Sequence, residues 1–289
     1  MTDPEQETAR TPTGPAFADA VTFAFGDAEA QVYGLARIGI SSEGASALAV
    51  LFAEREPVAA VARGGLDVTG EAWTGVEAGE LRATVEEPLS RWTVAYSGGE
   101  HGFALTFQAL GPAAEVGADV ASAGGMAGYE QVCLVTGTVQ VGGRSMPVRC
   151  LGQRGHSWGE PDWRRLEASR TVSAWIEDGP ALALSSVRPE GAAHADEPVW
   201  AALLGPGGVA PVDDPRLSTT YDGDGRQRRA GLELWMDGDD DDGFPARGSG
   251  EVLCGSTLDL GQLRLDCAFF RWRLEGREGV GRYDVLRRA

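Results

Sequence analysis

The sequence predicts an all-β protein built from two antiparallel β-barrel halves packed together. Apolar residues recur with a period of two or in short runs, and Gly, Pro, Asp or Ser bound these runs. Helical patterns are scarce. The 41 Gly and 15 Pro residues supply turns between many short strands, which is typical of antiparallel barrels and sandwiches.

Each expected strand is a segment of this kind, with turn residues on either side. The Gly142-Gly143 pair stands between two such segments as a two-residue hairpin turn, which places Val135 opposite Cys150. In chain order the expected strands are 31–40, 47–52, 91–97, 102–109, 129–141, 144–151, 171–176, 181–187, 199–204, 231–236, 250–254, 262–274 and 281–286.

The segment 111–128 is rich in Ala and Gly, so it predicts a connection between the halves, with a boundary near residue 125. The expected organisation is a disordered leader over 1–18, an N-terminal lipocalin-like β domain over 19–125 and a C-terminal lipocalin-like β domain over 126–289. Each half has enough strands for a barrel of the lipocalin kind, whose mouth can hold one apolar ligand.

Composition limits the partners. The net charge of −18, with 43 acidic against 25 basic residues, argues against nucleic acid and anionic membranes as partners. The 43% hydrophobic residues suffice for a sizeable core. The polar start over 1–14 lacks the pattern of a signal peptide, and the chain has no apolar run of membrane-spanning length. We therefore expect a cytoplasmic protein whose partner is an apolar small molecule.

Buried thiols are expected at the four cysteines, because disulfides are not the default in a cytosolic chain of this size. A turn at Leu260-Gly261 would place Cys254 opposite Cys267, which makes this pair the less improbable bridge. The four cysteines are Cys133, Cys150, Cys254 and Cys267.

The most informative stretch runs from Gly152 to Trp163 and reads Gly-Gln-Arg-Gly-His-Ser-Trp-Gly-Glu-Pro-Asp-Trp. An indole face stabilises positive charge in a dry pocket, and an imidazole or a carboxylic acid can move a proton to or from an apolar substrate. These residue types together point to hydration, dehydration or cationic cyclisation.

The core of this stretch, His156-Ser157-Trp158-Gly159-x-x-Asp162-Trp163, resembles the lipocalin-like superfamily of carotenoid 1,2-hydratases (hydroxyneurosporene synthases), kievitone hydratase and tocopherol-cyclase-like proteins. Further likeness comes from the segments 128–139 and 279–283 and from Trp175, while 26–37 looks like the start of an uncharacterised actinobacterial branch. The resemblance spans about 20 to 286 and implies the fold more firmly than the activity.

One position departs from the superfamily pattern. Members of the superfamily usually carry Asp directly before the histidine, whereas this chain has Gly155 before His156. If that aspartate is the proton donor of the family, its role passes here to His156, Asp162 or Glu160.

His156, Asp162 and Glu160 are the candidate catalytic residues. His156 can act as a proton donor or shuttle near neutral pH, or as a hydrogen-bonded turn residue that ties two strands together. Asp162 can orient His156 or protonate an alkene directly if burial raises its pKa; the alternative is a turn cap. Glu160 is the weakest of the three.

The candidate substrate-binding residues are aromatic. Trp158, Trp163 and Trp175 can line a cavity in which cationic character develops, and the alternative is that they fill the core. Tyr129 and Tyr283 can offer phenols to the pocket, with a structural role as the alternative.

No cofactor or metal is expected. The dispersed histidines and the acidic run Asp237 to Gly243 match no metal-site pattern, and a solvated loop is the favoured interpretation of the run. Glycine-rich phosphate cradles are absent from the sequence. The segment Gly155 to Gly159 matches Gly-x-Ser-x-Gly formally, but it lacks the strand-to-helix context of a hydrolase.

The sequence thus predicts a cofactor-independent acid–base enzyme, a hydratase, dehydratase or cation-driven cyclase, acting on an isoprenoid carbon–carbon double bond. The alternative is a non-catalytic carrier of an apolar lipid or polyketide, which keeps the cavity and needs no titratable group inside it.

Overall fold

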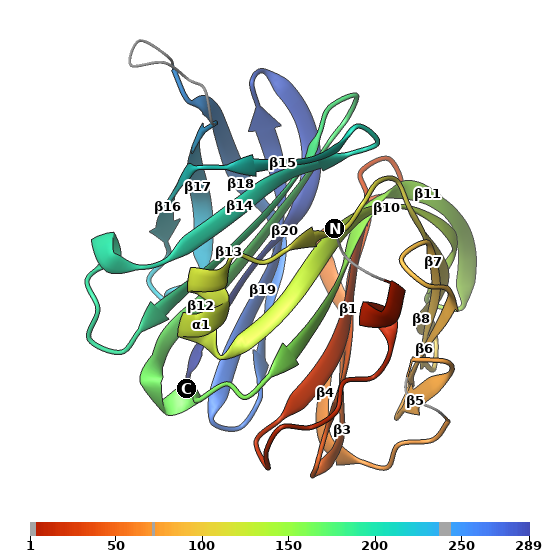
Figure 1. Ribbon diagram of the computed structural model, residues 1–289. Coiled ribbons are helices and arrows are strands. Elements are labelled where there is room, and N and C mark those ends of the chain that lie inside the picture. The colour runs from red at the N-terminus through yellow and green to blue at the C-terminus, as the bar shows by residue number, and fades with distance from the viewer. Residues whose placement is uncertain (1–3, 71–72, 237–243) are drawn as a thin grey trace. The chain divides into compact units, whose positions relative to one another are not determined.

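The computed structural model describes residues 4–70, 73–236 and 244–289, and it confirms the all-β fold with antiparallel pairing throughout its named strands (Figure 1). The acidic run 237–243 lies outside the described residues. The chain forms two compact units, of which the first is Met1–Glu115 with Gly125–Pro161 and the second is Val116–Gly124 with Asp162–Ala289.

The first unit is a nearly closed antiparallel barrel with β1 and β11 paired at its centre. Its strands run in the order β4-β3-β2-β1-β11-β10-β8-β7-β6-β5, with β9 beside β10. Its elements are the 3-10 helix η1 (Pro4–Glu7), β1 (Ala18–Asp27), β2 (Val32–Ser41), β3 (Gly44–Ala53), β4 (Glu56–Leu66), β5 (Val76–Ala78), β6 (Leu81–Glu87), β7 (Arg91–Gly98), β8 (His101–Ala109), β9 (Ala114–Glu115), β10 (Met126–Val141) and β11 (Arg144–Gly159).

The second unit is a nearly closed barrel with the strand order β15-β14-β13-β12-β20-β19-β18-β17-β16. Its elements are α1 (Ala118–Gly124), η2 (Trp163–Arg165), β12 (Leu166–Ile176), β13 (Ala181–Pro189), η3 (His194–Asp196), β14 (Val199–Gly205), β15 (Gly208–Val212), β16 (Asp214–Tyr221), β17 (Gln227–Trp235), β18 (Ala246–Asp259), β19 (Leu263–Leu274) and β20 (Arg277–Arg288).

The two units share one topology. In each, a meander of four strands is followed by a second meander whose last strand pairs with the first strand of the unit, β11 with β1 and β20 with β12. The last two strands of each second meander form a long hairpin, β10–β11 and β19–β20.

The unit boundary differs from the one expected near residue 125. Strands β10 and β11, expected in the C-terminal half, pair with β8 and β1 and belong to the first unit. The Ala- and Gly-rich segment 111–128 contains α1, which packs through Val120 against Leu166 and Val187 of the second unit. The chain therefore enters the second unit briefly and returns before β10.

The expected disordered leader over 1–18 also differs from the structure. Pro4–Glu7 forms a 3-10 helix, and the Glu7 side chain is buried. β1 was not predicted from the sequence, because Ala18–Asp27 is buried on both faces and shows little alternation.

The hairpin turn at Gly142-Gly143 is confirmed. Val135 lies opposite Cys150, and both glycines have positive φ, 55° and 76°, as a type I′ turn requires. The second turn is wrong in register: Cys254 lies opposite Phe269 and Cys267 opposite Ser256, because Asp259 pairs with Arg264 and the loop is longer than two residues.

All four cysteines are free thiols, with Cys150 half-buried and the other three buried. Burial raises the pKa of Cys133 and that of Cys150 to about 12, so both side chains carry protonated thiols near neutral pH.

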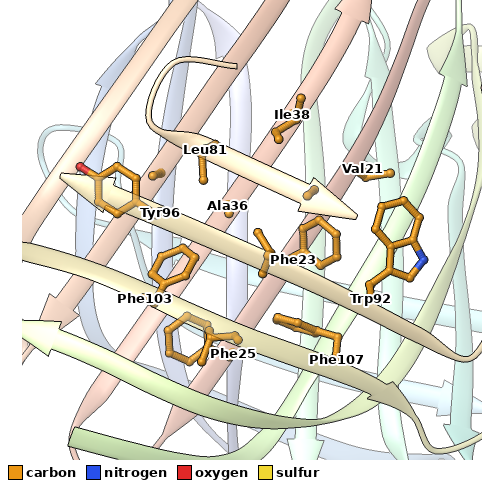
Figure 2. Packing of buried hydrophobic residues seen from close by; sticks show 14 of the residues in the cluster. Val21, Phe23, Phe25, Ala36, Ile38, Leu81, Trp92, Tyr96, Phe103 and Phe107 are labelled. Atoms are coloured by element: carbon orange, nitrogen blue, oxygen red, sulfur yellow. The ribbon is translucent and has the colours of Figure 1, made fainter. Parts of the chain in front are cut away.

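Aromatic side chains fill the first barrel (Figure 2). Phe23 packs against Trp92 and Phe107 at ring-centroid distances of 5.6 and 5.2 Å. In the figure Trp92 lies at the edge of the group, with its indole nitrogen turned away from the other labelled rings. That nitrogen marks where the apolar core gives way to polar groups.

Candidate active site

His156 lies on β11 between the two strands that pair with it, opposite Val21 of β1 and Tyr129 of β10. Its side chain is buried, with 1% of the residue exposed. Because alternate residues of a strand face opposite sides of the sheet, Arg154, His156 and Trp158 share one face. The histidine of the most informative stretch therefore faces the side of the sheet that carries Tyr129.

A buried carboxylate orients the imidazole. His156 Nε2 lies 2.6 Å from Asp19 Oδ1, while Asp19 Oδ2 accepts the Trp73 indole N–H at 3.1 Å and the Arg10 backbone N–H at 2.8 Å. Asp19 thus acts as an acceptor, which assigns the donating N–H to Nε2. The other ring nitrogen, Nδ1, is buried and has no hydrogen-bond partner in the described parts of the chain.

Aromatic rings surround this imidazole edge-on. The ring centroids of Trp73, Tyr129 and Trp158 lie 5.7, 5.7 and 5.0 Å from that of His156. The Arg10 guanidinium lies over the Trp158 ring, 4.0 Å from its centroid. Such a wall keeps water away from the imidazole.

A second buried carboxylate, Glu7, lies beside the first group. Its Oε1 accepts the Tyr129 hydroxyl and Arg154 Nη1, the latter at 2.7 Å. Its Oε2 accepts the Trp92 indole N–H at 2.5 Å and the Leu89 backbone N–H at 2.9 Å. Tyr129 therefore belongs to both groups, through its hydroxyl to Glu7 and through its ring to His156.

Gly155 lies on the opposite face of β11, where it pairs with Glu130 of β10. A Cβ at position 155 would come within 2.7 Å of a Glu130 carboxylate oxygen. Glu130 in turn accepts the Gln153 amide N–H at 2.7 Å. A carboxylate therefore occupies the space that an aspartate at position 155 would enter.

The other two candidate catalytic residues lie outside the His156 group. Asp162 caps η2 and pairs with Arg164 at 3.0 Å, and this hydrogen bond lowers the pKa of Asp162 below its usual value. Glu160 is exposed and accepts the Thr13 hydroxyl at 2.5 Å. These contacts fit a turn cap and a surface tether better than an acid for an apolar substrate.

Three of the aromatic candidates belong to the second unit, whereas the His156 group is built from the first. Trp163 packs beside Val120 and Leu166, and Trp175 lies 6.4 Å from Phe269 between ring centroids. Tyr283 is buried in the second core, and its hydroxyl lies 2.6 Å from that of Thr219.

The second unit has a buried ion pair of its own. Glu197 Oε1 accepts Arg170 Nη2 and the Ser186 hydroxyl, each at 2.7 Å, and Glu197 Oε2 lies 3.0 Å from His194 Nδ1. Burial acts to raise the pKa of Glu197, but the Ser186 hydrogen bond and the Arg170 charge outweigh it and lower that pKa. These contacts join β12, β13 and the segment after η3.

One pocket of the second unit, with a volume of about 230 Å³, is lined by Arg226, Gln227, Cys254, Asp266 and Cys267 among others. In the described ranges, no cluster of three or more His, Cys, Asp and Glu side chains could hold a metal ion. No helix among the same residues is long and apolar enough to cross a membrane.

Five residues of the His156 and Glu7 groups were not predicted from the sequence. Arg154 lies inside the stretch Gly152 to Trp163. Asp19 is a single charge between apolar residues, in Ala18-Asp19-Ala20-Val21, and a charge in such a strand is a signal of a buried functional group. The sequence contains no signal for Glu7, Trp73 or Trp92, because only the folded chain brings them together. The five are Glu7, Asp19, Trp73, Trp92 and Arg154.

A family model described as "Domain of unknown function (DUF7064)" matches residues 3–289. No curated protein matches the chain. Among solved structures, CghA with Sch210972 is similar with a TM-score of 0.70 and 14% identity, covering 98% of this chain and 94% of that chain.

Two further structures have the same fold. A protein assigned as an ATTH from Nitrosomonas europaea has a TM-score of 0.68 and 14% identity over 93% of this chain and 91% of its own. Kievitone hydratase from Nectria haematococca has a TM-score of 0.65 and 13% identity over 93% of this chain and 88% of its own. These similarities show that the chain shares the fold of the three proteins.

Proposed function

The chain belongs to the family described as "Domain of unknown function (DUF7064)", and we propose that it is a cofactor-independent acid–base enzyme acting on a carbon–carbon double bond of an isoprenoid. The reaction is a hydration, a dehydration or a cation-driven cyclisation. The observation that carries the proposal is the buried His156–Asp19 pair, 2.6 Å apart, enclosed by three aromatic rings.

In this proposal His156 is the residue that exchanges a proton with the substrate. Asp19 holds Nε2, so Nδ1 is the ring atom left to exchange the proton. Protonation of an alkene creates a carbocation, which the face of an adjoining aromatic ring stabilises. Asp19 is a positioning residue, because it acts through the imidazole.

The structural neighbours support the reaction class by fold alone. One of them is named a hydratase, and another was solved with Sch210972, a small molecule. Their low identities carry no residue assignment to this chain, so the roles of His156 and Asp19 rest on the geometry described above.

Glu130 is the second candidate for the acid. It occupies the space next to Gly155, where the superfamily usually has an aspartate, and it lies on the face of the sheet opposite His156. The two candidates therefore imply two different substrate positions, and substitution of each separates them.

The test compares four variants on a panel of linear and cyclic isoprenoids, with products identified by mass spectrometry. We expect His156→Asn to lower kcat by at least about a hundredfold, the usual contribution of general acid–base catalysis. Asp19→Asn should lower kcat and displace the pH profile. Asp162→Asn and Glu130→Gln should retain kcat within about threefold, since one is a partly exposed cap and the other faces away.

Other outcomes of this assay decide between the alternatives. Loss of turnover in Glu130→Gln with an active His156→Asn would move the acid to the opposite face. Tight isoprenoid binding without turnover by the wild-type protein across the whole panel would establish the carrier function instead.

A further inference from the structure

Glu7 stands out among the residues near the N-terminus. It is 2% exposed, whereas no residue from Thr8 to Ala16 is buried. The intervening segment is held by hydrogen bonds of the Arg10 backbone to Asp19 and of Thr13 to Glu160, and by the Arg10 guanidinium over the Trp158 ring. One carboxylate on a largely exposed segment therefore reaches into the barrel interior beside the His156 group.

The site that receives this carboxylate is complete. Four donors, from Leu89, Trp92, Tyr129 and Arg154, converge on its two oxygens, two on each. Two oxygens in one plane, each held by two donors, match a carboxylate better than a tetrahedral phosphate.

Part of the Arg154 guanidinium has no hydrogen-bond acceptor in the described residues. Its Nε and Nη2 atoms are buried and have no hydrogen-bond partner among the residues described, and its side chain is 1% exposed. Buried guanidinium donors normally have acceptors, because leaving them unpaired costs free energy. Glu7 therefore leaves part of the buried Arg154 guanidinium without an acceptor.

We propose that this site binds the carboxylate of an amphipathic ligand, and that Glu7 occupies it in the free protein and leaves when the ligand enters. Removing Glu7 alone would leave the Arg154 charge buried and unpaired, which is strongly unfavourable. A ligand carboxylate restores the pairing, whereas an alcohol does not. The ligand is therefore an acid with an apolar body.

The proposal also places the apolar body. Tyr129 contacts both Glu7 and the His156 ring, so a carboxylate anchored at Arg154 brings the adjoining carbon chain to the imidazole and its aromatic wall. This deepens the proposed function, on which it rests, by naming the substrate class as isoprenoid acids. The binding step can be tested without turnover.

The test uses retinoic acid and retinol, which share one isoprenoid body and differ in the carboxylate, with tryptophan fluorescence quenching as the readout. We expect Glu7→Gln and Glu7→Ala to bind retinoic acid at least about tenfold more tightly than the wild-type protein does, because the occupant no longer competes. Retinol affinity should change less than about twofold. Glu5→Ala, an exposed glutamate of the same segment, is the matched control.

The double variant Glu7→Gln with Arg154→Gln should lose the preference for the acid. Equal changes for the acid and the alcohol in both Glu7 variants, or an acid preference that survives Arg154→Gln, would overturn the proposal. Because His156→Asn keeps the anchor, it should retain the preference even when it is inactive, so failure of the catalytic proposal leaves this result readable.

Limited trypsin digestion of the wild-type protein supplies a second measurement that needs no variant. Arg10 lies between Glu7 and the hydrogen bond at Thr13, so release of Glu7 loosens the chain around the bond after Arg10 and lets a protease bind it. Retinoic acid should speed this cleavage and retinol should not, while cleavage after the exposed Arg164 stays constant. Equal cleavage rates after Arg10 with both compounds would show that the carboxylate does not displace Glu7.

Discussion

At the scale of single residues, burial and pairing decide which polar groups of the motif can do chemistry. The motif Gly152 to Trp163 contains three titratable candidates, yet only His156 is buried, and its partner Asp19 is 137 residues away in the chain. Composition and spacing could find the histidine because it stands among tryptophans. They could not find its partner, because the pairing of β1 with β11 is a product of the fold.

The side chain of Glu130 on the neighbouring strand limits which residue position 155 can hold. We expect Gly155→Asp to destabilise the protein by about 1–2 kcal/mol, because two half-buried carboxylates would then face each other across β10 and β11. Adding Glu130→Ala should restore most of this stability. Urea unfolding of Gly155→Asp and of the double variant measures these free energies. A Gly155→Asp protein as stable as wild type would contradict the repulsion argument.

At the scale of elements, the long hairpin of β10 and β11 carries Tyr129, Arg154 and His156. Its turn was predictable because two adjacent glycines between strand-like segments specify a type I′ turn. The strands with which the hairpin pairs were not predictable, because its alternation of apolar and polar residues fits pairing with strands of either half. The expected boundary near residue 125 was based on composition, whereas the observed boundary depends on the pairing of β11 with β1.

The turn offers a clean test of what holds this hairpin. Gly142 has φ of 55°, and a Cβ at this position would have no neighbouring atom within 4 Å. Only backbone strain therefore opposes a substitution there. We expect Gly142→Val to cost about 1–2 kcal/mol, because β-branched residues are strained at positive φ.

Gly142→Asn is the matched variant, because asparagine favours the first central position of a type I′ turn. It should be neutral or slightly stabilising. Thermal unfolding distinguishes the two, and an equal loss of Tm in both would show that something other than φ limits this position.

At the scale of the whole molecule, the two units share a pattern of strand connection, and each has its own buried ion pair. The first has Arg154 with Glu7, and the second has Arg170 with Glu197, both at 2.7 Å. The all-β class was predictable, since period-two patterning and turn residues recur along the chain. The shared topology was not, because it lies in strand order and not in repeated sequence.

The Glu197 pair makes the stability of the molecule depend on pH in a known direction. The folded pKa of Glu197 lies below its unfolded value of about 4.3, so the ionised form stabilises the fold above that pH. This contribution is lost as the pH falls through the lowered pKa. Glu197→Gln leaves Arg170 buried without a charged partner and should cost about 3–5 kcal/mol at pH 7.

Below the unfolded pKa of about 4.3 the deficit of Glu197→Gln should begin to shrink, because the unfolded wild-type chain then takes up a proton that the folded chain does not. Urea midpoints at pH 7 and pH 3.5 measure the difference. Glu167→Gln is the control, since Glu167 pairs with Arg188 at 3.2 Å with half of its side chain exposed and should cost little at either pH. A deficit independent of pH would mean that shape and hydrogen bonding, and not the charge of Glu197, hold β12 and β13 together.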